Sequence, residues 1–372
     1  MSTQTNEIEE IKAVKPNAGF FKKASRPYYI FGPCSAESEE QVISTAKAIS
    51  ENFSDVVYRA GLWKPRTRPG NFEGVGEKGL GWLKSVKEQF GFQVCTEVAN
   101  PKHLELCLKN GIDMVWLGAR TTVNPFSVQE IADALKGVDI PVLIKNPIHP
   151  ELSLWLGAIE RIQNSGINDI GLIHRGVHYR NNLPYRNLPY WEFAIELKRL
   201  FPEYPLLCDA SHICGTPELL PKVAQKAFDL AMDGLMIETH IDPPNALSDV
   251  QQQITPDELE ALISSLQFKS SEILNEEFKN ELDSLRNKID VIDEELLEKI
   301  ALRMHYIKKI GKYKKENNVT IFQLERWNQI IDRVRKLATN LGLSKPFVKK
   351  VFDDIHDESI SLQRKIGNDK DN

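Results

Sequence analysis

The chain has 372 residues, of which 41% are hydrophobic and 27% charged, and its formal net charge at pH 7 is -5. This length exceeds that of a usual single domain, so we expect two domains. The negative charge argues against a nucleic-acid partner held by a general basic surface. No apolar run approaches the roughly 18 residues of a membrane span, so no membrane association is expected.

The cysteines and the first residues indicate a reducing compartment. The five cysteines are odd in number and form no CxxC pair. The segment MSTQTNEIEEIKAVK at the start contains no apolar stretch that could act as a signal peptide. We therefore expect a cytoplasmic protein with reduced thiols, one or two of which could bind a metal.

Eight short apolar runs, rich in β-branched and aromatic residues, alternate with helical patterns over the first 250 residues or so. Eight such units predict an α/β fold, the (β/α)8 TIM barrel. A doubly wound open sheet is the second choice, but GPCSAE after the first run is not the glycine-rich nucleotide turn of that fold. The runs lie at 28–32, 56–60, 92–96, 113–118, 141–145, 169–173, 205–209 and 234–238.

The last third of the chain has a helical pattern instead. Apolar residues spaced by three and four predict a long amphipathic helix that runs to about Lys315. Further helices are predicted near 323–340 and 345–365, so this domain is all-α. Three helices with one unusually long member do not easily close a core alone, and we expect a homodimer formed through this domain. The apolar stripe consists of Leu282, Leu285, Ile289, Ile292, Leu296 and Ile300.

These patterns divide the chain into four segments. We expect a barrel domain over 1–265, a linker over 266–278, a helical domain over 279–366 and a disordered tail over 367–372.

Six cationic side chains lie at or just beyond the ends of four predicted strands. In a barrel, side chains at these ends build the active site. Any one of them alone could be a solvated surface charge. Converging cations repel one another unless they share an anionic ligand, and arginine suits phosphate and carboxylate groups. The set therefore predicts a substrate that bears both groups, or two phosphorylated substrates. Its members are Arg59, Lys64, Arg66, Arg120, Lys145 and Arg175.

A second set combines a thiol, an imidazole and carboxylates. Cys34, His212 and Glu238 follow predicted strands 1, 7 and 8, which are neighbours in a closed barrel, and Asp249 lies farther along the chain. Alone, a cysteine is more often an apolar filler and a histidine a hydrogen-bonded core residue. Together these donors suit one divalent transition metal, with Mn, Fe, Co and Zn as candidates.

Ten motifs in order along the first 255 residues resemble the metal-dependent 3-deoxy-D-arabino-heptulosonate 7-phosphate synthases of type I, β subgroup. The resemblance implies a transferase that condenses phosphoenolpyruvate with D-erythrose 4-phosphate, at the start of aromatic amino acid biosynthesis. The motifs are GPCS (32–35), RAGLWKPRT (59–67), GLGWLK (79–84), TEV (96–98), GAR (118–120), LIK (143–145), HRG (174–176), DASH (209–212), IETH (237–240) and ALSDVQQ (246–252).

The resemblance also implies roles for the residues in these motifs. The metal ligands would be Cys34, His212, Glu238 and Asp249. The phosphate of phosphoenolpyruvate would be held by Arg120, Arg175 and backbone N–H groups near Ala119. Its carboxylate would be held by Arg59, Lys64 and Lys145, and the aldose phosphate by Arg66 and Thr67.

Two further roles concern catalysis. We expect Lys64 to donate a proton to the new hydroxyl, and Glu97 to position or deprotonate water. The nearest competing reaction is that of an octulosonate phosphate synthase, which uses arabinose 5-phosphate. That lineage typically carries a KANRS-like segment where this chain has KPRT at 64–67, so the four-carbon aldose is favoured. The segment NPIHP at 146–150 also departs from the pattern of many relatives.

Residues 278–365 resemble the all-helical AroQ-class chorismate mutases, which are isomerases that convert chorismate to prephenate. The implied catalytic residues are Arg303, Lys314 and Gln363, which would clamp a carboxylate and donate to the ether oxygen. Arg286 would more naturally serve the site of a partner chain. Gln323 and Trp327 stand where bacterial relatives often carry acidic residues. The full substrate-binding set would be Arg286, Arg303, Lys314, Gln323, Arg326, Ser359 and Gln363.

The fusion suggests regulation as well as catalysis. The mutase acts downstream of the synthase, so we expect prephenate or chorismate at the helical domain to inhibit the barrel. The alternatives are a helical domain that has lost catalysis and only senses a ligand, or a phosphometabolite sensor with an inactive barrel. The retained cations and metal donors argue against an inactive barrel.

Overall fold

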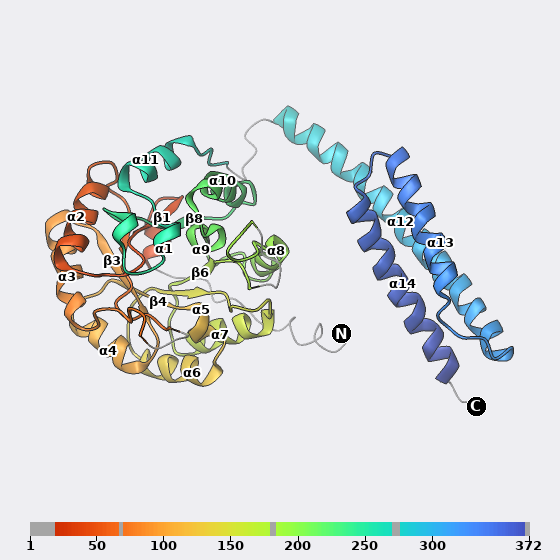
Figure 1. The fold of residues 1–372 in the computed structure, drawn as a ribbon, viewed down its shortest axis with the longest axis horizontal. Coiled ribbons are helices and arrows are strands. Elements are labelled where there is room, and N and C mark those ends of the chain that lie inside the picture. Colours follow the sequence, from red (N-terminus) through yellow and green to blue (C-terminus); the bar gives the residue numbers. More distant parts are fainter. Residues whose placement is uncertain (1–18, 67–69, 179–183, 270–275, 369–372) are drawn as a thin grey trace. The chain divides into compact units, whose positions relative to one another are not determined.

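Eight parallel strands close into a barrel in the order β1 to β8, and β8 pairs with β1 to complete it (Figure 1). The predicted barrel is confirmed, and the open sheet is wrong. Each predicted apolar run overlaps one strand, and only β3 and β6 extend beyond their runs, by two residues and one residue. The strands are β1 (Tyr28–Gly32), β2 (Val57–Arg59), β3 (Gln93–Val98), β4 (Met114–Leu117), β5 (Val142–Lys145), β6 (Ile170–His174), β7 (Leu206–Asp209) and β8 (Gly234–Glu238).

This computed structural model describes residues 19–66, 70–178, 184–269 and 276–368. Thr67 and most of the predicted tail lie outside the described residues. The chain divides into two compact units, residues 1–271 and 272–372.

Helices surround the barrel, and polar side chains fix where several of them begin. Ser38, Asn100 and Asn124 each accept a hydrogen bond from a backbone N–H in the first turn of the following helix. Thr255 and Glu258 form a reciprocal capping box at the start of the last barrel helix. The helices are α1 (Phe20–Lys23), α2 (Glu39–Ser50), α3 (Lys78–Phe90), α4 (Pro101–Lys109), α5 (Ala119–Thr122), α6 (Pro125–Ala134), α7 (Leu152–Asn164), α8 (Trp191–Leu200), α9 (Ala210–Cys214), η2 (Pro217–Leu219), α10 (Leu220–Asp229), η3 (Pro243–Asn245), η4 (Val250–Gln252) and α11 (Pro256–Ser265).

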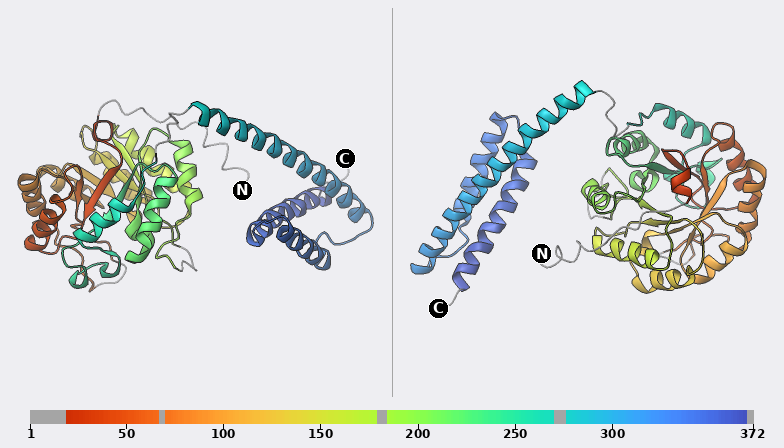
Figure 2. Two further views of the ribbon diagram at one scale, coloured as in Figure 1. Left: turned by 90° about the horizontal axis from the view of Figure 1, so that it is seen from above. Right: turned by 180° about the vertical axis from the view of Figure 1, so that it is seen from behind.

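The barrel has two apolar layers, one between strands and helices and one inside the barrel. The short helix α1 closes the inner layer at the end where the strands begin, and in the view from behind it lies over the barrel opening (Figure 2). The Asp169 carboxylate accepts hydrogen bonds from the backbone N–H groups of Phe20 and Phe21. A Cβ on Gly171 would lie 2.6 Å from the Phe21 ring, so β6 needs glycine there. This end is sealed, and the site must open at the other end.

The second unit consists of three helices, α12 (Glu276–Glu316), α13 (Leu324–Asn340) and α14 (Lys345–Asn368). Both α12 and α13 pack against α14, and the start of α12 extends beyond the other two helices (Figure 1). Because α12 begins at Glu276, its first residues lie within the segment predicted as linker. The helix α14 likewise runs two residues into the segment predicted as a disordered tail.

Much of the predicted apolar stripe on α12 is exposed in the single chain. Leu285, Ile289, Ile292 and Leu296 are each at least 50% exposed. A small core is buried between α13 and α14 instead, around Ile331.

None of the described helices combines the length and the hydropathy that a membrane crossing requires.

The packing of α1 generates a stability prediction. Replacing Phe21 with Ala should lower the free energy of unfolding by about 3 kcal/mol, because the side chain fills the sealed end of the barrel. Phe126 is 83% exposed, so Phe126→Ala is the matched control and should leave stability nearly unchanged. Denaturant unfolding of the full chain, followed by tryptophan fluorescence, measures both. Equal effects of the two changes would contradict the sealing role of α1.

Candidate active site

A cavity of about 540 Å³ opens at the end of the barrel where the strands finish. The predicted cations Lys64, Arg66, Arg120, Lys145 and Arg175 line it, so the structure brings five of the six together. It is also lined by Arg186, Asn187 and Asp249, among others. Arg186 was missed from the sequence because it lies within the long connection after β6, not at the end of a strand.

Arg59 differs from the prediction. It is the last residue of β2, is 1% exposed, and is not among the residues that line the cavity. Its Nη2 pairs with Glu238 Oε1 at 3.1 Å, and its guanidinium lies 5.0 Å from the centre of the Trp116 ring. Its Nε and Nη1 have no hydrogen-bond partner among the described residues. Arg59 is therefore a buried cation beneath the cavity.

Lys145, Asp209 and His212 form a connected group at the ends of β5 and β7. Lys145 Nζ lies 2.5 Å from Asp209 Oδ2, and His212 Nδ1 lies 2.9 Å from the same oxygen. Burial alone would raise the pKa of Asp209, but His212 and Lys145 lower it well below the usual range. Asp209 is therefore a fixed negative charge that orients both neighbours.

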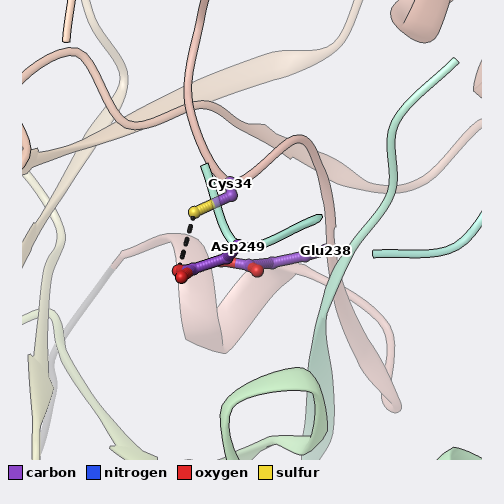
Figure 3. A group of neighbouring side chains, drawn as sticks. All are labelled: Cys34, Glu238 and Asp249. Carbon is purple, nitrogen blue, oxygen red and sulfur yellow. Dashed lines mark hydrogen bonds between the residues drawn. The ribbon is translucent and has the colours of Figure 1, made fainter. Parts of the chain in front are cut away.

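Cys34, Glu238 and Asp249 offer ligand atoms that all lie within 4.8 Å of one another. Figure 3 shows the Cys34 sulfur pointing at the Asp249 carboxylate, and Sγ lies 3.2 Å from Oδ2. The three residues come from the loop after β1, the end of β8 and the start of η4. We call these three side chains the donor group.

His212, the fourth predicted ligand, lies beside the donor group and not within it. Its Nδ1 is 3.8 Å from Glu238 Oε1 and hydrogen-bonded to Asp209. A carboxylate on one ring nitrogen is the usual way to orient a histidine whose other nitrogen binds a metal. Burial lowers the pKa of His212, which keeps the ring neutral, as a metal ligand must be.

The donor group fits a divalent cation. Glu238 Oε1 is buried, and among the described residues it has the ion pair with Arg59 at 3.1 Å but no hydrogen bond of normal geometry. Burial, reinforced by Glu238, raises the pKa of the Cys34 thiol to about 12. A thiol and two carboxylates in contact are costly unless a cation neutralises them. Thiolate, imidazole and carboxylate together suit a transition metal.

Lys64 joins the donor group to the cavity. Its Nζ lies 2.9 Å from Cys34 Sγ and 3.1 Å from the Cys34 carbonyl oxygen. Burial would lower the pKa of Lys64, but the nearby Cys34 and Glu238 raise it. A charged ammonium therefore stands between the cavity and the sulfur.

The remaining cations are held by local contacts. Arg120 Nη1 donates to the Pro65 carbonyl oxygen at 2.6 Å, and Arg66 Nε donates to the Phe72 carbonyl oxygen at 2.8 Å. Arg175 Nη1 donates to Asn187 Oδ1 at 2.9 Å. Burial, together with the neighbouring Arg186 and Arg120, lowers the pKa of Arg175 to about 10. An anion in the cavity would relieve this repulsion.

The unusual segment at 146–150 has a structural role at its first residue. Asn146 Oδ1 accepts from the Arg175 backbone N–H at 2.7 Å, and its Nδ2 donates to the Gly176 carbonyl oxygen at 2.9 Å. Asn146 thus ties the loop after β5 to the loop that carries Arg175.

Glu97, at the end of β3, also faces the cavity. Its Oε2 accepts from Trp116 Nε1 at 3.1 Å. A Cβ on Gly118 would lie 2.0 Å from Glu97 Oε1, so a larger residue there would displace this carboxylate from its present position. Gly118 and Ala119, which also lines the cavity, begin the short helix α5.

In the helical unit, α14 approaches α12 closely near the predicted mutase residues. Arg303 Nη1 donates to Ser359 Oγ at 2.6 Å. A Cβ on Gly311 would lie 3.2 Å from Gln363 Cγ, so the two helices nearly touch there. Gln363 is 6% exposed, and its Oε1 is buried without a hydrogen-bond donor among the described residues. The structure therefore brings Arg303, Ser359 and Gln363 to one helix pair.

The other predicted mutase residues make contacts of their own, and Lys314 lies on α12 three residues after Gly311. Lys314 Nζ donates to the Ile321 carbonyl oxygen at 2.6 Å, and Arg326 Nη1 contacts Gln329 Oε1 at 3.3 Å. Gln323 precedes α13 as its N-cap residue. The ring of Trp327, one of the departures noted in the sequence, stacks on His356 with 3.9 Å between ring centres.

Arg286 cannot reach the same site within one chain. It is exposed, pairs with Asp283 at 3.2 Å, and lies on the same helix as Arg303. Their separation in sequence corresponds to about 25 Å along the helix axis.

Comparison with known proteins assigns each of the two units to a family. Residues 13–275 match the DAHP synthetase I family, and residues 285–364 match the chorismate mutase type II family. A phospho-2-dehydro-3-deoxyheptonate aldolase of Thermotoga maritima is 31% identical over 283 residues, covering 76% of each chain. A 2-dehydro-3-deoxyphosphooctonate aldolase of Helicobacter pylori is 29% identical over 274 residues, covering 66% of this chain and 95% of the relative.

A solved structure shares the barrel. The crystal structure of the phospho-2-dehydro-3-deoxyheptonate aldolase (DAHP synthase) of Thermotoga maritima superposes with a TM-score of 0.58 at 29% identity. The match covers 69% of this chain and 70% of that one. The chain therefore belongs to the DAHP synthetase I family and joins a barrel of that family to a type II chorismate mutase domain, as a bifunctional transferase and isomerase of aromatic amino acid biosynthesis.

Proposed function

We propose that the barrel condenses phosphoenolpyruvate with D-erythrose 4-phosphate, releasing phosphate and 3-deoxy-D-arabino-heptulosonate 7-phosphate, with one divalent metal ion. The observation that carries this proposal is the contact between the two halves of the site. A cavity lined by five predicted cations meets the donor group at Lys64, whose Nζ lies 2.9 Å from Cys34 Sγ. Phosphorylated substrates need the cations, and a metal needs the donors.

Different cations of the cavity would bind different anionic groups of the two substrates. Arg120 and Arg175, with the backbone at Ala119, would bind the phosphate of phosphoenolpyruvate. Lys64 and Lys145 would bind its carboxylate, with Arg59 adding positive charge from below. Arg66 and Thr67 would bind the phosphate of the aldose.

Cys34, His212, Glu238 and Asp249 would hold the metal, with Mn, Fe, Co and Zn as candidates. A divalent cation bound there supplies a Lewis acid for an aldehyde oxygen. Lys64 would donate a proton to the new hydroxyl, since its ammonium reaches both the cavity and Cys34. Glu97 would position or deprotonate water at the cavity wall.

Arabinose 5-phosphate is the competing aldose, because several relatives are 2-dehydro-3-deoxyphosphooctonate aldolases. The motif KPRT at 64–67 favours erythrose 4-phosphate, and so does the heptonate relative, which is more similar in sequence and matches a larger share of this chain.

For the helical unit we propose rearrangement of chorismate to prephenate. Arg303 and the Arg286 of a partner subunit would clamp the two carboxylates, and Lys314 and Gln363 would donate to the ether oxygen as negative charge develops there. Ser359 would orient Arg303, which it contacts at 2.6 Å. Arg326 and Gln323 would complete the substrate contacts. The buried, unpartnered oxygen of Gln363 supports a ligand near it.

A homodimer through α12 would complete this site. The exposed stripe of Leu285, Ile289 and Ile292 supports it, because a row of half-exposed apolar side chains on a long helix favours burial against a second copy. Arg286 lies beside this stripe and too far from its own Arg303.

The domain boundaries and the cellular compartment are also part of the proposed function. We retain a barrel domain over 1–265, a linker over 266–278, a mutase domain over 279–366 and a short tail. Five buried cysteines without a disulfide support a cytoplasmic protein.

The condensation is tested by phosphate release with each sugar phosphate, with and without a chelator. Erythrose 4-phosphate should be the better substrate, and the chelator or Cys34→Ala should abolish turnover. Lys64→Met should lower turnover at least about 100-fold. Lys84→Met, on the exposed face of α3, is the matched control. Near-normal turnover of Lys64→Met would contradict the proton-donor role, and a preference for arabinose 5-phosphate would contradict the substrate.

The shared mutase site is tested with mixed dimers. Co-expressed Arg286→Ala and Arg303→Ala chains should recover about a quarter of the wild-type rate, since half of the dimers would carry one complete site. Each variant alone should be nearly inactive. Co-expressed Arg303→Ala and Lys314→Ala chains are the control and should recover nothing, because both residues serve their own chain's site. The readout is loss of chorismate absorbance, and equal recovery in both mixtures would refute a shared site.

Feedback is the remaining proposal, with prephenate as its first candidate effector. Saturating prephenate should lower the synthase rate of the full chain, and Arg303→Ala should remove this inhibition because it removes a carboxylate contact. An unchanged synthase rate in wild-type protein would show that the helical unit does not regulate the barrel through prephenate.

A further inference from the structure

Three consecutive glutamines follow the donor Asp249 and lie in different environments. Gln251 is exposed, whereas Gln252 and Gln253 are 1% and 3% exposed. Burying an amide is unfavourable unless each of its polar atoms has a hydrogen-bond partner. The partners of the two buried amides therefore indicate what each glutamine holds in place.

Gln252 ties two donor carboxylates together. Its Nε2 donates to Glu238 Oε2 at 2.5 Å. Its Oε1 accepts a hydrogen bond from Arg186 Nη1, while Arg186 Nη2 pairs with Asp249 Oδ1 at 3.1 Å. The amide and the guanidinium thus form a bridge from Glu238 to Asp249. These contacts use Glu238 Oε2 and Asp249 Oδ1. They leave Asp249 Oδ2 beside Cys34 Sγ, and Glu238 Oε1 beside Arg59 and His212.

Gln253 ties the third donor to the same loop. Its Oε1 accepts from the backbone N–H of Cys34 at 2.9 Å, and its Nε2 donates to the Ser248 carbonyl oxygen at 2.8 Å. Ser248 directly precedes Asp249. The loop after β1, which carries the thiol, is therefore fastened to the segment that carries the carboxylate.

We propose that Gln252 and Gln253 are positioning residues that hold Cys34, Glu238 and Asp249 together as one preformed metal site. Two carboxylates and a thiol repel one another or are costly when charged and close, so they need a restraint that holds them together before a metal ion binds. A neutral amide restrains a carboxylate without adding a positive charge that would compete with the ion. Outer partners of this kind typically govern metal affinity.

This positioning role rests on the proposed metal site. An experiment can distinguish it from a role in the fold alone. If the amides served only the fold, their loss would destabilise the chain equally with and without metal. If they position the donors, their loss must weaken metal binding more than it weakens the metal-free protein.

The experiment uses the full chain stripped with a chelator and titrated with Co²⁺ alone. Gln252→Met and Gln253→Met keep the length of the side chain and remove its hydrogen bonds, and Gln251→Met is the matched control. Binding is followed by the charge-transfer absorption of a cobalt–thiolate bond, which reports on Cys34 directly. Thermal unfolding is measured in chelator and in excess Co²⁺.

The two buried variants should bind Co²⁺ about 10- to 100-fold more weakly than wild type, with a smaller rise of Tm on adding metal. Their Tm in chelator should change little, and Gln251→Met should match wild type throughout. Wild-type affinity in both buried variants would overturn the positioning role and leave the metal site standing. Failure of the wild-type chain itself to bind Co²⁺ would instead overturn the proposed function.

A variant that does not fold is replaced by Gln252→Asn or Gln253→Asn, which keeps the amide and shortens its reach. The same loss of affinity is expected. If the Asn variants also fail to fold in chelator, the amides serve the fold itself and the positioning role is contradicted.

Discussion

Two buried ion pairs hold the mouth of the barrel together. Arg59 pairs with Glu238 at 3.1 Å and Lys145 pairs with Asp209 at 2.5 Å, and all four side chains are at most 6% exposed. A charge taken out of water is tolerated only with a close partner and satisfied hydrogen bonds. Each carboxylate is also shared, since Glu238 belongs to the donor group and Asp209 orients His212. The cations and the donors are therefore one electrostatic unit.

Because each carboxylate serves two neighbours, many charged side chains can lie within a few ångströms of one another in this site. Removing one member of a buried pair typically costs about 3–5 kcal/mol, because the other charge is left without compensation. The barrel provides the framework that bears this cost, with a sealed apolar end at α1 and a polar end above it. An anionic substrate and a cation would each relieve part of the remaining imbalance.

The sequence predicted the barrel and most of its mouth, because parallel strands end at one edge and polar residues at those ends must meet. It did not predict that Arg59 lies beneath the cavity, since whether a strand-end side chain points inward depends on its place in the closed sheet. Arg186 lies in the connection after β6 and Gln252 in the short helix η4, and tertiary contacts that the sequence pattern does not reveal bring them together. The apolar stripe of α12 was predicted from the spacing of its residues, but most of it is exposed in the single chain.

The most direct measurement is the number of protons released when a divalent ion binds. At about pH 8 the His212 ring is neutral and the carboxylates of Glu238 and Asp249 are ionised, because the pKa of each is lowered. The Cys34 thiol keeps its proton, since burial raises its pKa to about 12. Calorimetry of the stripped chain in buffers of different ionisation enthalpy should therefore find release of about one proton, and none in Cys34→Ala. Metal binding without proton release, or no binding at all, would contradict a thiolate-bound ion beside the cationic cavity.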